Sequence, residues 1–61
     1  MRIQTTIKQI RKKLGLTQTE LAEKIGSNRF NVANYETGRA MPPADVYVRI
    51  LDLDPDQKQA A

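Results

Sequence analysis

The chain has 61 residues and a formal net charge of +3, with neither cysteine nor histidine. A chain of this length buries only about 60% of the surface that it exposes when unfolded, so we expect one domain, residues 1–61, with a small core. The missing Cys and His exclude disulfides, the usual zinc sites and the usual nucleophile–base pairs, so we expect no enzyme, metal or cofactor. Because no apolar run approaches the roughly 20 residues that span a bilayer, we also expect no membrane partner and a cytoplasmic location.

The charges are unevenly distributed along the chain. Residues 1–43 contain eight basic and three acidic residues, a net charge of +5, whereas residues 44–61 contain two basic and four acidic residues, a net charge of −2. A positive N-terminal part predicts an anionic partner. The alternative is a solvated surface, and Lys8, Lys12 and Lys13 fit such a face, which would aid non-specific attraction to an anionic partner.

An apolar stripe at helical spacing predicts the first helix, with Ile3, Ile7, Ile10 and Leu14 on one side. Thr5 or Thr6 could cap this helix, and Ile3 would then lie just outside it and pack back onto it. Gly15 is the expected end, because glycine commonly follows the last helical residue.

Two short helices joined by a tight turn are predicted between Thr17 and Gly38. Thr17 and Glu20 have the spacing of a capping box, which marks the start of the first of the two helices. Its inward stripe is Leu21, Ala22 and Ile25, and Gly26 ends it. Asn28 is a good cap for the next helix, whose Val32 and Tyr35 are expected to face inward.

The inward positions of that last helix leave four side chains outside: Arg29, Phe30, Asn31 and Asn34. Arginine can donate two hydrogen bonds to guanine O6 and N7, and asparagine can pair with adenine N6 and N7. An exposed phenyl ring suits the methyl group of thymine. The alternative for Phe30 is that it folds back onto the core.

The remaining residues predict a fourth helix and a short fifth turn. Pro43 suits the start of a helix, and the inward stripe that follows is Val46, Ile50 and Leu53. Val48 and Met41 are expected to be exposed and to offer a dimer contact. Asp54, Pro55 and Gln57 are typical of a further helix start. The sequence therefore predicts an all-α fold of four to five helices.

Two segments, LTQTELAEKIG and NYETGR, resemble the helix-turn-helix domains of phage repressors and Cro proteins, the XRE or Cro-C1 family. The resemblance extends from about Ile7 to Leu53. It implies a compact lambda-repressor-like domain, with the helix-turn-helix formed by its second and third helices. In that family the second helix of the motif lies in the DNA major groove. The implied partner is double-stranded DNA.

Carried over by position, the resemblance assigns site residues of three kinds. The recognition helix, at about residues 29–36, would contact bases through Asn28, Arg29, Phe30, Asn31 and Asn34. Gln18 and Arg39, the latter with backbone N–H groups around Gly38 to Met41, would contact phosphates. Arg11 and Glu36 would form a partly buried structural ion pair, which removes Arg11 from the charge available to DNA.

Three functions fit these features. The first is a transcription regulator, of the repressor or Cro type, that binds a palindromic operator as a homodimer. The second is an antitoxin-type regulator with a toxin partner, because VRILDLDP is similar to a stretch of HigA- and MqsA-like antitoxins. The third is a helical protein-interaction module, although Arg29, Asn31 and Asn34 suit base edges better than an interface core.

Overall fold

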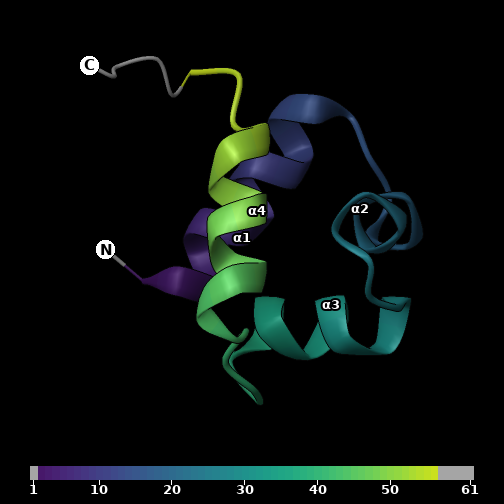
Figure 1. The fold of residues 1–61 in the computed structure, drawn as a ribbon, viewed down its shortest axis with the longest axis vertical. Helices are drawn as coiled ribbons and strands as arrows, with labels where there is room; N and C mark the ends of the chain where they lie inside the picture. Colours follow the sequence, from purple (N-terminus) through teal and green to yellow (C-terminus); the bar gives the residue numbers. More distant parts are fainter. Residues whose placement is uncertain (1, 57–61) are drawn as a thin grey trace.

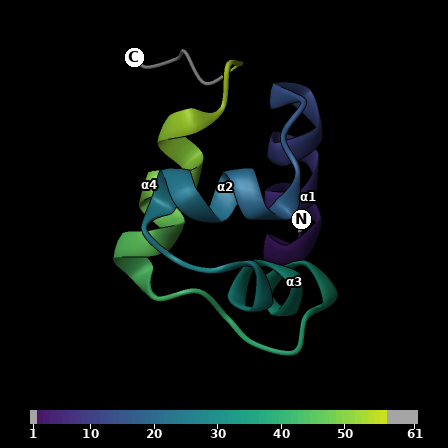
Figure 2. The ribbon, with the colours of Figure 1, turned by 90° about the vertical axis from the view of Figure 1, so that its right-hand side faces the viewer.

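The computed structural model describes residues 2–56, which form four α-helices and no strand (Figure 1). The helices are α1 (Ile3–Leu14), α2 (Gln18–Ile25), α3 (Arg29–Thr37) and α4 (Ala44–Leu53). Figure 2 shows α1 and α4 running in the same direction, α2 crossing beside them and α3 lying across one end of the molecule. The predicted all-α class and the four main helices are confirmed.

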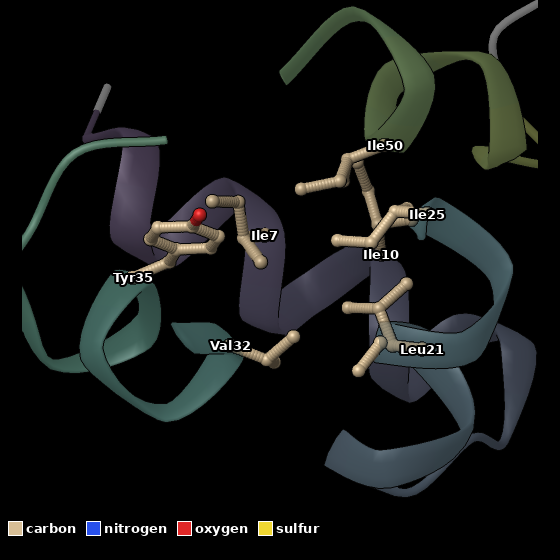
Figure 3. Packing of buried hydrophobic residues seen from close by; sticks show 8 residues of the cluster. Ile7, Ile10, Leu21, Ile25, Val32, Tyr35 and Ile50 are labelled. Carbon is tan, nitrogen blue, oxygen red and sulfur yellow. The ribbon is translucent and has the colours of Figure 1, made fainter. Parts of the chain in front are cut away.

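The core is built from one apolar side of each helix. Figure 3 shows these side chains lying between the helices and pointing toward one another. The buried apolar residues are Ile7, Ile10, Leu21, Ala22, Ile25, Val32, Tyr35 and Ile50. Every one of them belongs to a stripe that the sequence predicted, and Val46 and Leu53 of α4 lie partly buried against them. Hydrophobic spacing therefore accounts for the core of the described residues.

The ends of α2 and α3 are fixed by local hydrogen bonds. Thr17 Oγ1 accepts from the N–H of Glu20 at 3.1 Å, and Glu20 Oε1 accepts from the N–H of Thr17 at 2.8 Å, so the predicted capping box is present. Asn28 Oδ1 accepts from the N–H of Asn31 at 2.9 Å and caps α3. Gly26 ends α2 with a φ of 70°, a left-handed conformation that costs glycine no Cβ clash.

The predicted cap of α1 is wrong. The helix begins at Ile3 after Arg2, and no side chain caps it, so Thr5 and Thr6 lie inside its first turns. The N–H of Thr6 donates to the carbonyl of Arg2 at 3.0 Å. Ile3 is partly buried against the core, so tertiary packing extends the helix beyond the nearest good capping residue.

The chain after α4 forms a turn over Asp54–Asp56. The N–H of Asp56 donates to Asp54 Oδ1 at 3.0 Å, and Lys13 at the end of α1 bridges Asp54 and Asp56 at 3.2 and 3.0 Å. Gln57, which belonged to the predicted fifth turn, lies outside the described residues. Within residues 2–56, no helix is both long and apolar enough to cross a membrane.

Candidate nucleic-acid interface

Helix α3 lies near one end of the molecule in both views (Figures 1 and 2). Phe30, Asn34 and Thr37 follow one another at spacings of four and three, so they form one row along the helix. Phe30 is 72% exposed, so the alternative that it folds back onto the core is wrong. Thr37 is also exposed, and half-buried Ala33 lies beside the row. Both were missed as candidates, although helical spacing from Phe30 could have found them.

Two of the predicted base-contacting residues also hold the turn between the helices. Asn28 uses its side-chain oxygen to cap α3. Asn31 donates from Nδ2 to Ser27 Oγ at 3.0 Å. Arg29 lies exposed in the same turn of helix. The side chains of Arg29 and Phe30 therefore stand outside the hydrogen-bonded turn that Asn28 and Asn31 stabilise.

Arg11 and Glu36 form a bidentate ion pair between α1 and α3. Arg11 Nε donates to Glu36 Oε2 at 2.6 Å, and Arg11 Nη2 donates to Glu36 Oε1 at 3.0 Å. The side chains of Arg11 and Glu36 are only 15% and 4% exposed. The hydrogen bonds that Arg11 donates to Glu36 raise the pKa of Arg11 above its ordinary value. Arg11 Nη1 also donates to the carbonyl of Leu16 at 3.0 Å, so this one guanidinium joins α1, α3 and the loop before α2.

Gln18 at the start of α2 also reaches Glu36. Its Nε2 donates to Glu36 Oε1 at 3.2 Å, so its side chain connects the first turn of α2 to α3. The N–H groups of Gln18 and Thr19 occupy the first two positions of α2, where a helix provides no carbonyl acceptor. Such N–H groups, together with the positive end of the helix dipole, suit a phosphate.

The loop after α3 folds onto the carbonyl of Asn34. This oxygen accepts from the N–H groups of Gly38, Arg39 (3.0 Å) and Ala40 (3.3 Å). These three N–H groups, which were expected to contact phosphate, are thus directed into the protein, and the exposed side chain of Arg39 is the basic group of this loop. Gln4 of α1 lies against the same loop: a Cβ placed on Gly38 would be 3.1 Å from Gln4 Nε2. Sequence reasoning missed Gln4, because nothing local to it indicates this long-range contact.

Comparison with known proteins identifies the family. The helix-turn-helix family model matches residues 7–53 of the chain. The protein belongs to the XRE, or Cro-C1, helix-turn-helix family. In this helix-turn-helix domain α2 and α3 form the motif, and α1 and α4 support it through the shared core.

Two relatives of this helix-turn-helix domain come from archaea. A protein of Pyrococcus furiosus named as an HTH-type transcriptional regulatory protein is 38% identical over 47 residues, which are 77% of this chain and 15% of the relative. An uncharacterized HTH-type transcriptional regulator of Methanothermobacter thermautotrophicus is 48% identical over 40 residues, which are 66% of this chain and 58% of the relative. The matched region therefore spans less than two thirds of either relative. No solved structure gives a significant match.

The ion pairs of the helix-turn-helix domain change the predicted surface charge. Lys13 was expected on a solvated basic face, but it is paired with Asp54 and Asp56. Hydrogen bonds to these two carboxylates raise the pKa of Lys13, that to Asp56 contributing most. Arg11 is likewise paired with Glu36. Two of the eight basic residues in 1–43, Arg11 and Lys13, therefore already form ion pairs within the chain. Arg29 and Arg39 lie exposed at the two ends of α3.

Proposed function

We propose that this protein is a sequence-specific double-stranded DNA-binding transcription regulator that places its recognition helix, residues 29–36 of α3, in the major groove. The observation that carries the proposal is the side of α3 away from the core, where Arg29 and Phe30 are exposed in the first turn and half-buried Asn34 follows one turn later. In a recognition helix, the N-terminal residues contact base edges. The names of the two archaeal relatives support a role in transcription. The proposed role needs no catalytic step, and a cytoplasmic location is proposed with it, because DNA lies in the cytoplasm of the archaea from which the two relatives come.

Phosphate contacts would fix the orientation of the domain, and base contacts would supply specificity. Gln18 at the N-terminus of α2 and Arg39 after α3 are the proposed phosphate contacts. Arg29 would bind guanine and Asn34 adenine. The Arg11–Glu36 pair supports these contacts indirectly, because it holds the C-terminal turn of α3 against α1 while Gln18 ties α2 to the same carboxylate.

Asn28 and Asn31 would contact bases through the side-chain polar atoms that form no hydrogen bond within the turn. Asn28 caps α3 with its oxygen, which leaves the Nδ2 group of this exposed residue as a donor. Asn31 uses Nδ2 toward Ser27, which leaves its oxygen as an acceptor. Their contribution should therefore be smaller than that of Arg29, because the turn restricts where both amides can point.

We propose that the regulator acts as a repressor and binds a palindromic operator as a homodimer. A helix of nine residues is about 14 Å long, so one copy of α3 reaches a single half-site. A second copy would place its recognition helix about 34 Å away, in the next major groove on the same side of the duplex. Exposed apolar residues that could join two copies are Met41 and Val48, which are 66% and 53% exposed.

Selection of bound duplexes from a random-sequence pool tests this function, and the half-site spacing in the selected DNA reports the dimer. Affinity for the selected duplex should fall steeply as salt rises, since phosphate contacts release counterions. Arg29→Ala should reduce affinity by about 1–3 kcal/mol and relax the preference at one base pair only. Lys24→Ala, which removes an exposed charge from α2, is the matched control and should leave every base preference intact.

Two results would contradict the proposal. If Arg29→Ala weakens all sequences equally, Arg29 contacts phosphate and the base assignment is wrong. If the pool yields no preferred sequence and binding does not respond to salt, the protein-interaction module becomes the better interpretation.

A further inference from the structure

The first turn of α3 presents two adjacent side chains of different chemistry. Arg29 is an exposed hydrogen-bond donor, whereas Phe30 exposes 72% of an apolar ring that has no donor or acceptor. The neighbouring amides of Asn28 and Asn31 are directed into the turn by their hydrogen bonds to the N–H of Asn31 and to Ser27. Phe30 is therefore the exposed apolar group of this turn.

An apolar ring in the major groove has one kind of apolar partner. Base edges there present donors and acceptors, except that thymine also presents its C5-methyl group. A cytosine that is methylated at C5 presents the same methyl group at the same ring position. Because the ring of Phe30 forms no hydrogen bond, it cannot distinguish the O4 of thymine from the amino group of cytosine next to that methyl.

We infer that Phe30 recognises a C5-methylpyrimidine, so that binding depends on a thymine methyl and responds to cytosine methylation. This inference rests on the proposed function and specifies what one residue of the recognition helix binds. It also explains why an exposed phenyl ring is tolerated on a small domain, since the ring leaves water when DNA binds.

The adjacent Arg29 makes a methylated CpG step a suitable ligand. Arginine binds the O6 and N7 atoms of guanine, and in such a step the guanine directly follows the methylated cytosine. A phenyl ring on the methyl group and a guanidinium on the neighbouring guanine would come from consecutive residues. Both groups lie in the exposed first turn of α3.

Single-methyl substitutions in the duplex selected by the full chain test the inference. Uracil replaces each thymine in turn, which removes only the methyl group, and 5-methylcytosine replaces each cytosine, which adds only a methyl group. We expect at least one position in each half-site where the methyl strengthens binding about fourfold, the effect of burying one such group. In Phe30→Ala the dissociation constants with and without that methyl should become equal.

Lys24→Ala is the matched control, because it removes a long exposed side chain from α2, outside both α3 and the proposed dimer contact. This variant should retain the full methyl effect. Circular dichroism should show both variants folded, since neither side chain belongs to the core. A methyl effect that persists in Phe30→Ala would overturn the inference, as would a wild-type affinity that no methyl group changes. If the wild-type chain selects no DNA sequence at all, the proposed function itself fails, which is a separate and recognisable outcome.

Discussion

Replacing Glu36 with glutamine should destabilise the fold by about 3 kcal/mol. The carboxylate is 4% exposed, and it accepts two hydrogen bonds from Arg11 and one from Gln18. Removing one partner of a buried ion pair typically costs about 3–5 kcal/mol, because the other charge remains buried without compensation. Arg11 is 15% exposed and keeps its bond to the Leu16 carbonyl, so we expect the lower end of that range. A domain of this size has a total stability of only about 3–9 kcal/mol.

Urea unfolding followed by circular dichroism at 222 nm measures this change, with the slope of free energy against urea expected to stay constant. The control is the double variant Arg11→Met with Glu36→Leu, which removes both charges and replaces the two side chains with apolar ones of similar volume. It should lie within about 1 kcal/mol of the wild type, since buried pairs can be replaced by well-packed apolar residues at little cost. The reasoning is refuted if Glu36→Gln costs under about 1 kcal/mol, which is the effect of an exposed pair. It is also refuted if the double variant loses as much stability as the single variants Arg11→Met and Glu36→Leu lose together.

Further predictions concern the helix ends and the C-terminal turn. Gly38→Ala should lower the free energy of urea unfolding by about 1–2 kcal/mol, because Gly38 has a φ of 84°. Adding Gln4→Ala should recover only the part due to the 3.1 Å approach of the new Cβ to Gln4 Nε2. Full recovery would exclude backbone strain as the cause. Thr17→Ala should cost about 1 kcal/mol by removing the oxygen that accepts from Glu20, and an unchanged unfolding midpoint would show that the capping box contributes nothing. The hydrogen bond from the N–H of Asp56 lowers the pKa of Asp54, and Lys13 lowers it further by a smaller amount. These contacts therefore stabilise the folded state above about pH 4, and their contribution is lost as pH falls through the lowered pKa. The stability difference between wild type and Asp54→Asn should therefore shrink toward pH 2, and a difference that grows on acidification would contradict this assignment.

Local patterns in the sequence were sufficient for the helices, the core and the capping box, because spacing and capping chemistry act within a few residues. The start of α1 was placed wrongly, since the packing of Ile3 against the core outweighs the capping preference of Thr5 or Thr6. The candidate site was predictable only as far as it follows helical spacing.

Contacts between distant segments could not be predicted from spacing. Glu36 accepts a hydrogen bond from Gln18 as well as from Arg11, and Lys13 forms an ion pair with Asp54 in the turn after α4. No short-range pattern in the sequence joins these residues. The resemblance to a family supplied the Arg11–Glu36 pair, and the structure shows both of its hydrogen bonds. The position of the Gln4 side chain beside Gly38 likewise depends on how α1 packs against the end of α3.

The loop that carries Arg39 is held by the main-chain oxygen of Asn34, whereas the side chain of the same residue lies on the proposed DNA-binding row. Every amino acid has that carbonyl, so the anchoring of the loop does not depend on which side chain occupies position 34. Base preference at this position could therefore diverge between descendants of the protein while the Arg39 loop keeps its shape. Under the proposed function, a new operator would then need a change at one residue only, while the loop that carries the proposed phosphate contact of Arg39 stays as it is.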